Sequence, residues 1–191
     1  ATIKLQDPSG IRCLDDDSTI ILQNVMIELG TNGWLIDKGS IKFKDYVEIS
    51  TSYGFVGSGN DLEADERYAP LTFSSKGLLS IAEKSSLKIN GDIEFLYNPL
   101  PASVDEPWSV SKRRLSFADE TSSLIMEHCK VNTAPFGMAF DYGQLKIIDR
   151  VFFSIDSTNT MAFLELSSNL YLKVASDSSL NIDGPIKYFV P

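Results

Sequence analysis

The sequence LKVASDSSLNIDGPIKY, residues 172–188, contains three short pairs of alternating apolar residues. Small polar corners separate the pairs, and the second corner is Asp183-Gly184-Pro185, a combination typical of a tight turn. Strict alternation over a few positions indicates strands and not helices. The stretch therefore predicts strand, turn, strand, turn, strand, with the apolar pairs Leu172 and Val174, Leu180 and Ile182, and Ile186 and Tyr188.

The spacing of the last two pairs returns five more times along the chain. A strand with the same alternation precedes each copy, and hydroxyl or glycine residues stand at the corner between them. Three short strands with one apolar face each cannot enclose a core alone, so the copies are expected to stack on one another. The aligned positions are Ile20, Leu22, Val25, Ile27; Ile41, Phe43, Val47, Ile49; Leu87, Ile89, Ile93, Phe95; Leu124, Met126, Cys129, Val131; Leu145, Ile147, Val151, Phe153; and Leu180, Ile182, Ile186, Tyr188.

The repeat predicts an all-β fold, a parallel β-helix or β-solenoid of about six to eight coils, in one domain over residues 1–191. The 21-residue intervals that begin at Ile20 and Leu124 are expected to be single coils without insertions. Residues 51–70 and 98–114 are rich in glycine, charge or proline and are predicted to be two loop insertions. Residues 154–171 are apolar enough to supply a further coil.

This pattern of apolar pairs, Ser-Ser corners and Asn/Asp-Gly corners resembles the parallel β-helix proteins found outside cells, such as autotransporter passenger domains and filamentous adhesins. The resemblance covers nearly the whole chain and concerns an architecture, not one family. It implies an extracellular or cell-surface location.

Composition narrows the classes of partner. The chain has 191 residues, 43% of them hydrophobic, and a formal net charge of -9. This charge argues against nucleic acid or an anionic membrane surface as the main partner. No run approaches the roughly 20 apolar residues that a membrane-spanning helix needs. Cys13 and Cys129 fall on apolar positions without metal or redox spacing, so two buried free thiols are expected.

Two kinds of side chain invite a metal or catalytic role. His128, the sole histidine, stands where other copies have Asn24, Asp45 or Asp149, and we interpret it as a turn residue. Carboxylates could bind Ca²⁺ in two places, although solvated acidic loops explain them equally well. We therefore predict no cofactor, with Ca²⁺ as the alternative, at Asp15, Asp16 and Asp17 or at Asp61, Glu63, Asp65 and Glu66.

Polysaccharide lyases and hydrolases also use parallel β-helices, so an enzyme is an alternative to a structural role. Lys42, Lys88 and Lys146 share one position in the repeat, beside Glu48 and Glu94 on the following strand. A lysine row beside a glutamate row is more simply a solvated face with cross-strand charge pairs, because a catalytic groove needs a mixed cluster on one or two coils. We predict no enzymatic activity.

Aromatic residues in the two predicted insertions are candidates for contact with a glycan or a host protein. They are Tyr53, Phe55, Tyr68 and Trp108, and they are equally able to fold back over the solenoid.

The two ends of the solenoid are the last candidate site. Ile3 and Leu5 already alternate at one end, and no polar or helical cap follows the apolar strand at the other. Open strand ladders must be capped or must pair with another chain. We therefore predict a segment of a longer solenoid, or a subunit of a structural or adhesive filament that self-associates through its ends, with contacts at Ile3, Leu5, Ile186, Tyr188, Phe189 and Val190.

Overall fold

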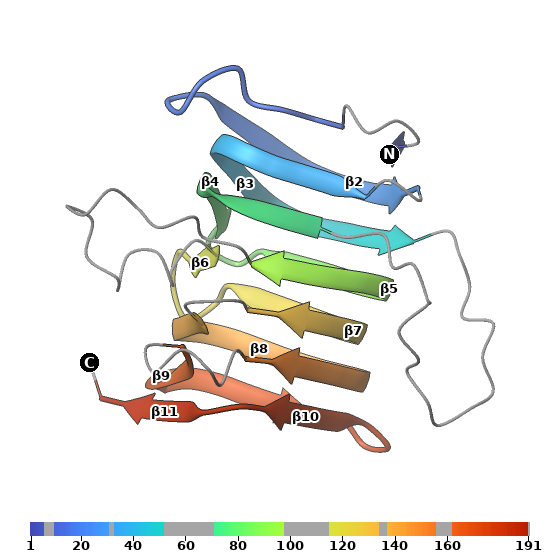
Figure 1. Ribbon diagram of the computed structural model, residues 1–191. Coiled ribbons are helices and arrows are strands. Elements are labelled where there is room, and N and C mark those ends of the chain that lie inside the picture. Colours follow the sequence, from blue (N-terminus) through green and yellow to red (C-terminus); the bar gives the residue numbers. More distant parts are fainter. Residues whose placement is uncertain are drawn as a thin grey trace.

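Strands make up most of the described part of the chain. A computed structural model describes residues 1–5, 10–30, 33–51, 71–97, 115–133, 137–155 and 162–190. These residues form eleven strands and no helix (Figure 1). The strands are β1 (Thr2–Leu5), β2 (Thr19–Leu29), β3 (Trp34–Thr51), β4 (Leu71–Ile81), β5 (Ser86–Tyr97), β6 (Leu115–Phe117), β7 (Ser123–Asn132), β8 (Gly137–Ser154), β9 (Phe163–Val174), β10 (Ser179–Asp183) and β11 (Ile186–Phe189).

Every pairing among the described strands is parallel. Each strand pairs with strands that are one or two places away in the chain order. Paired strands lie about 4.8 Å apart, so residues of one kind stack into ladders. The all-β prediction is confirmed, and the parallel pairing fits a β-solenoid. One ladder joins Ile3, Ile27, Ile49, Ile89, Met126, Ile147 and Val174.

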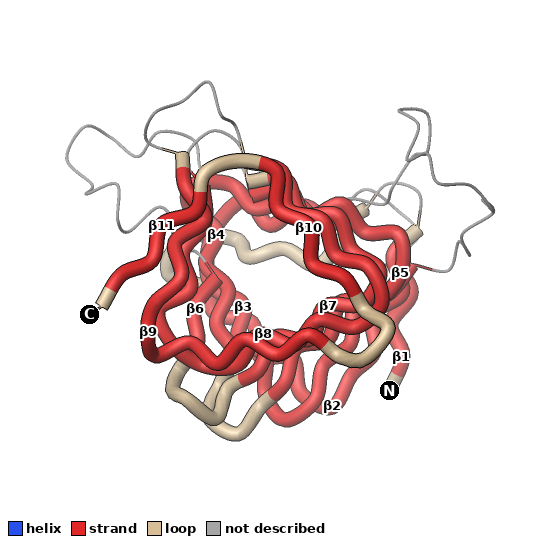
Figure 2. The backbone as a smooth tube through the Cα atoms, turned by 90° about the horizontal axis from the view of Figure 1, so that it is seen from below, coloured by secondary structure: helices blue, strands red, loops and turns tan. Residues whose placement is uncertain are grey.

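The strands form three faces around a common interior, and Figure 2 shows them as a ring seen along the stack. Face B is the face that carries the ladder from Ile3 to Val174. Face C carries Trp34, Leu71, Phe95, Val131, Phe153 and Ile182. Face A carries Leu22, Phe43, Ile81 and Phe117, followed by Phe140, Leu166 and Tyr188. The Phe117 and Phe140 rings join the two parts of face A at a centroid distance of 6.0 Å.

The corners between faces use left-handed backbone. Asn24, Asp45 and Lys84 have positive φ where the chain passes from face A to face B. Asn and Asp tolerate this conformation better than most residues do, which explains their recurrence at the corners. The prediction that His128 is a corner residue is confirmed, because it has a φ of 55°. It shares the corner between faces B and C with Gly91, Asp149 and Asp177, which also have positive φ.

Hydroxyl groups from one turn of the chain bind the corner of another. The Asp45 amide donates to Ser85 Oγ at 2.8 Å, and the Asp149 amide donates to Ser178 Oγ at 2.9 Å. Lys84 makes the same contact with Thr121 Oγ1, at 2.7 Å. Corner amides point out of the strand ladder and need an acceptor. The recurring Ser and Thr residues are therefore the acceptors of the corner amides.

The repeat register derived from sequence is correct within two groups of copies and wrong between them. Ile20 pairs with Ile41, and Leu124 pairs with Leu87 and Leu145, as the alignment requires. However, Ile41 pairs with Leu79 and not with Leu87, and Leu145 pairs with Leu172 and not with Leu180. The three faces share one local pattern, an apolar pair followed by a polar corner. An alignment can therefore slip by one face wherever the interval between copies is long.

Residues 10–18 contain no strand and lie at the N-terminal end of the stack, above β2 in Figure 1. Trp34 Nε1 donates to the Ile11 carbonyl at 2.8 Å, and the Ser40 amide donates to the Ser18 carbonyl at 2.9 Å. Gly39 has a φ of 69°, and a Cβ there would lie 2.6 Å from the sulfur of Cys13. Glycine therefore lets this segment pack closely on β3.

The two cysteines are free and buried, as the sequence predicts. The predicted insertions fall almost entirely outside the described residues, as do Tyr53, Phe55, Tyr68 and Trp108 and the acidic residues Asp61, Glu63, Asp65 and Glu66.

Candidate functional site

The last turn of the chain leaves its inward row uncovered. We call this row the C-terminal end face and define it as Leu172 and Val174 of β9, Leu180 and Ile182 of β10, and Ile186 and Tyr188 of β11. The six residues occupy the final positions of faces B, C and A. Figure 1 shows β10 and β11 at the end of the stack opposite β1.

Exposure changes abruptly at this end. Ile147 is fully buried, yet Val174, which follows it on the face B ladder, is 43% exposed. Leu172 is 40% exposed, whereas its partner Leu145 is buried. On face A the exposure reaches 53% at Ile186 and 67% at Tyr188. The apolar core of the stacked strands therefore continues to the surface at the C-terminal end face.

The backbone of these strands is open as well. Among the described residues, β10 pairs only with β8, and β11 pairs only with β9. An edge strand presents a row of donors and acceptors that another strand can use. Natural proteins usually protect such edges with charges, bulges or covering segments. Here an open edge coincides with an apolar row, and this combination suits β-strand addition.

The residues that were predicted to form end-to-end contacts lie at the two opposite ends of the stack. Ile186, Tyr188 and Val190 are exposed at the C-terminal end, and Phe189 is half-buried. Ile3 and Leu5 lie at the opposite end, where Leu5 is buried. The sequence-based list omits the exposed Leu172 and Val174. The sequence contained a signal that could have identified Leu172 and Val174. They belong to the last copy of the repeat, whose inward row has no later copy to cover it.

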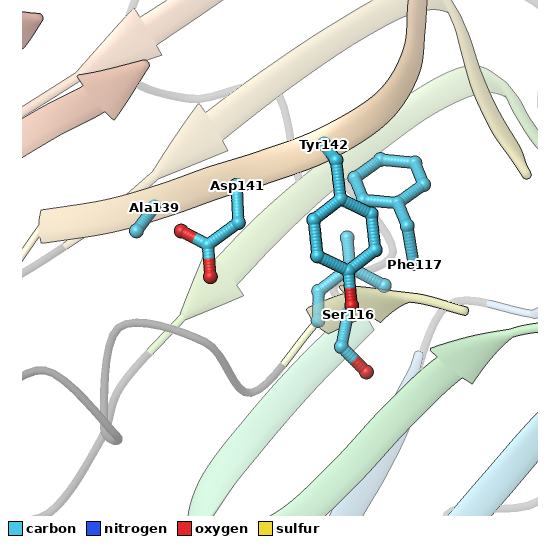
Figure 3. A pocket seen from close by; sticks show the side chains of 6 residues that line it. Ser116, Phe117, Ala139, Asp141 and Tyr142 are labelled. Carbon is cyan, nitrogen blue, oxygen red and sulfur yellow. The ribbon is translucent and has the colours of Figure 1, made fainter. Parts of the chain in front are cut away.

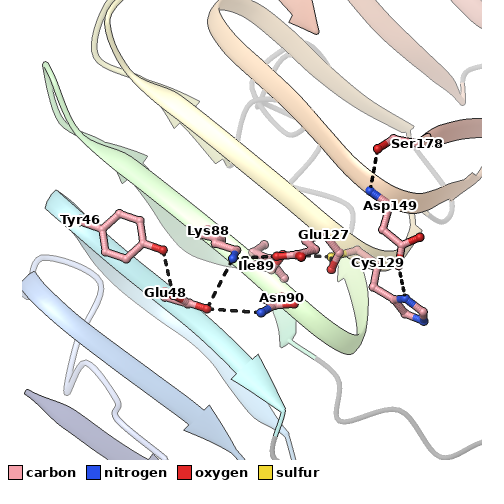
Figure 4. Close-up of polar contacts among 10 residues, drawn as sticks. Tyr46, Glu48, Lys88, Ile89, Asn90, Glu127, Cys129, Asp149 and Ser178 are labelled. Atoms are coloured by element: carbon pink, nitrogen blue, oxygen red, sulfur yellow. Dashed lines mark hydrogen bonds and ion pairs between the residues drawn. The ribbon is translucent and has the colours of Figure 1, made fainter. Parts of the chain in front are cut away.

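A polar network occupies the outer side of face B (Figure 4). Tyr46 donates to Glu48 Oε2 at 2.8 Å, and Lys88 Nζ lies 2.7 Å from Glu127 Oε2 and 3.8 Å from Glu48 Oε1. Burial opposes the charge of Lys88, but its hydrogen bond to Glu127 and the two carboxylate charges together raise its pKa. Burial and the hydrogen bond to Glu48 raise the pKa of Tyr46 to about 12. The network joins one lysine of β5 to two glutamates, one on β3 and one on β7.

The predicted rows of lysine and glutamate are not formed. Lys42 pairs with Ile21 and Ser80 on face A, whereas Lys88 lies beside Glu48 on face B. The error follows from the slipped register, which placed residues of different faces in one row. The predicted charge pairing is present, although its geometry differs from the one expected.

His128 Nδ1 lies 2.8 Å from Asp149 Oδ2 at the corner between faces B and C. Ser178 Oγ accepts from the Asp149 backbone amide at 2.9 Å, as Figure 4 shows. The neighbouring Cys129 is buried and its thiol donates to the Ile89 carbonyl at 3.3 Å.

A small pocket lies on face A, where β6 meets β8 (Figure 3). Its volume is about 150 Å³, and Asp141, Tyr142 and Ser116 are its polar lining residues. Ligand pockets usually enclose about 300–1,000 Å³. Asp141 is the single carboxylate among the described lining residues, whereas glycoside hydrolysis generally uses two.

Asp15, Asp16 and Asp17 lie in the segment at the N-terminal end of the stack. The Asp15 carboxylate accepts from Ser18 Oγ at 2.6 Å, and this hydrogen bond lowers the pKa of Asp15. No group of three or more His, Cys, Asp or Glu side chains is placed to hold a metal ion among the described residues.

Comparison with known proteins gives no match: no family model, curated protein or solved structure is significantly similar to this chain. The described segments contain no helix with the length and apolar character needed to span a membrane.

Proposed function

We propose that this chain is a non-enzymatic structural module of an extracellular or cell-surface appendage, and that it self-associates through the end of a β-solenoid. The observation that carries the proposal is the C-terminal end face, which combines an exposed apolar row with open strand edges. Monomeric proteins rarely leave a contiguous apolar surface of this kind uncovered.

The sides of the solenoid support the same role. Lys88 is matched by Glu48 and Glu127 on face B, and Lys4 lies 2.9 Å from Glu28 near the N-terminal end. Charge pairs of this kind keep the sides hydrated and oppose lateral sticking. The end of the stack differs from the sides because its exposed apolar row meets open strand edges.

The proposal includes a solenoid of seven coils in a single domain. The face B ladder has seven members, from Ile3 to Val174, and each coil contributes one of them. A stack of this kind gains stability from each neighbouring interface, so it can serve as a rigid spacer without a cofactor.

Sedimentation velocity over a range of protein concentrations tests the proposal. We expect the mass to rise above 21.1 kDa with concentration, because association buries the C-terminal end face. Tyr188→Lys places a charge in that face and is expected to keep the chain monomeric. Ile21→Lys is the matched control, since Ile21 is an exposed apolar residue of β2 outside the face. A wild-type chain that stays at 21.1 kDa at every concentration would contradict the proposed function.

A further inference from the structure

We infer that the pocket on face A binds a guanidinium group, which is the head of an arginine side chain or of a small guanidine compound. The pocket lies on the side of the stack, so this inference goes beyond end association and does not depend on it. Three features carry it: a cavity at an interruption of the strand ladder, a lining of apolar carbon and oxygen acceptors, and a carboxylate in that lining.

The cavity lies where the ladder of face A is interrupted. Among the described strands, β6 pairs with β4 but not with β8. The Phe117 and Phe140 rings contact each other across the interruption at a centroid distance of 6.0 Å. The pocket between the two strands has a volume of about 150 Å³, and a cavity of about this volume in another protein holds a benzene ring. A flat group of that size or smaller therefore fits.

The lining combines apolar carbon with oxygen atoms. Leu115, Phe117 and Ala139 are buried and supply the apolar part. Ser116 Oγ donates to the Leu79 carbonyl at 3.3 Å, and its oxygen retains the capacity to accept a hydrogen bond. The described lining residues include no lysine, arginine or histidine. The pocket therefore suits a ligand group that carries several N–H donors and no negative charge.

Asp141 and Tyr142 select a cation within this class. Figure 3 shows both side chains extending from β8 beside the pocket. A carboxylate has about four acceptor sites, so Asp141 can keep its contacts within the protein and still accept from a ligand. Guanidinium is planar, pairs with carboxylates and stacks on aromatic rings such as that of Tyr142, which is 40% exposed. The net charge of -9 also attracts cations to the chain. Charge therefore favours guanidinium over a neutral sugar ring.

Asp37 occupies the same local position as Asp141 and provides a matched control. Each aspartate stands at a register shift within its strand, two residues before a glycine with positive φ, Gly39 or Gly143. The backbone role of the aspartate is therefore common to both positions. Asp37 does not line the face A pocket. A loss of ligand binding that is confined to Asp141 variants thus reports on the pocket and not on the bulge.

Chemical-shift titration of the intact chain with methylguanidinium, and with arginine blocked at both ends, tests the inference. We expect both compounds to shift the amide signals of residues 115–117 and 139–142. Citrulline blocked in the same way is the neutral isostere of the arginine probe, and it should bind at least about tenfold more weakly. Asp141→Asn should weaken the binding of blocked arginine by a similar factor, and Asp37→Asn should leave it unchanged.

Tyr142→Ala provides a second test that does not require Asp141→Asn to fold, because Tyr142 is exposed. It should weaken the binding of blocked arginine by about threefold. Tyr171→Ala is its control, since Tyr171 is exposed on β9 outside the pocket.

The remaining outcomes identify the source of the ligand or overturn the inference. Tighter binding of blocked arginine than of methylguanidinium assigns the pocket to arginine side chains of a protein partner, and equal affinity assigns it to small guanidine compounds. Equal binding of citrulline and arginine overturns the inference, as does unchanged binding in Tyr142→Ala together with Asp141→Asn. Shifts of the pocket signals by methyl glucoside but not by methylguanidinium indicate a sugar site and overturn it as well.

Discussion

Single residues at the corners determine whether the chain can turn from one face to the next. The chain turns from face A to face B at Gly143, which has a φ of 90°. A Cβ at this position would lie 2.6 Å from the Phe117 ring. The Phe117 ring packs against Phe140 in the core. This corner therefore requires glycine for two reasons, its backbone conformation and the lack of space.

Gly143→Ala is expected to destabilise the protein by about 1–3 kcal/mol, because the methyl group must displace a packed ring. Lys84→Gly is the matched control, since Lys84 is exposed and already has positive φ. Its effect should stay within about 1 kcal/mol. Urea unfolding followed by tryptophan fluorescence measures both variants. Equal stability of Gly143→Ala and the wild type would show that the ring can move at no cost.

Titration of Tyr46 makes the stability of the folded protein depend on pH in the alkaline range. Its pKa rises from 10.0 to about 12 in the folded protein, so the unfolded chain releases this proton first. The contribution of Tyr46 to stability is therefore fully present below pH 10.0 and is lost as the pH rises towards about 12. Tyr46→Phe lacks this titration. We expect the difference in urea midpoint between wild type and Tyr46→Phe to shrink over that interval, and a constant difference would contradict the assignment.

Strands and corners were predictable from the sequence wherever local chemistry determines them. The alternation of Ile41 with Phe43 predicted an inward row, and the corner residues Asn24, Asp45 and His128 all have left-handed backbone. The pairing of one strand with another was less predictable. Faces A, B and C share one local pattern, so the sequence did not distinguish Leu79 from Leu87 as the partner of Ile41.

The candidate site was predicted in part for a related reason. Exposure at the end of a stack depends on which residues form the last turn, and this requires the register. The sequence identified Ile186 and Tyr188 because they follow the last corner, but it did not identify Leu172. It also treated the two ends as alike, because nothing in the alternation of Ile3 and Leu5 reveals that residues 10–18 pack against β3.

The hydroxyl-to-corner bonds predict how neighbouring turns support each other. Ser85 is buried, and its Oγ accepts from the Asp45 amide and donates to the Glu83 carbonyl at 2.9 Å. Ser85→Ala leaves the Asp45 amide without this acceptor and should cost about 1–3 kcal/mol. Ser178→Ala removes the same kind of bond at a half-buried corner, where water can replace the hydroxyl, and should cost less. Thermal and urea unfolding compare the two variants, and equal losses would contradict a role for burial.

At the scale of the whole molecule, the two ends differ in their protection. In the N-terminal row Leu5 and Leu22 are buried and Ile3 and Ile20 are partly buried, whereas the C-terminal end face exposes Val174 and Tyr188. Stacked repeats are stabilised by their neighbours, so a turn with a neighbour on one side only is expected to open most easily. Under the proposed function, the same turn would gain most from association, because a second copy would supply the missing neighbour.

Hydrogen exchange at rising protein concentration should therefore slow in β10 and β11 and stay unchanged in the central strands β5 and β7. Association protects the edge amides by pairing them, and the central strands already have partners on both sides. Mass spectrometry of peptides that cover residues 179–190 measures the effect. In Tyr188→Lys the same peptides should exchange at one rate at all concentrations, because this variant cannot bury the face. Exchange in wild-type β10 and β11 that does not depend on concentration would mean that these edges remain open even when the protein is concentrated, and the end face would then not be the surface that joins the copies.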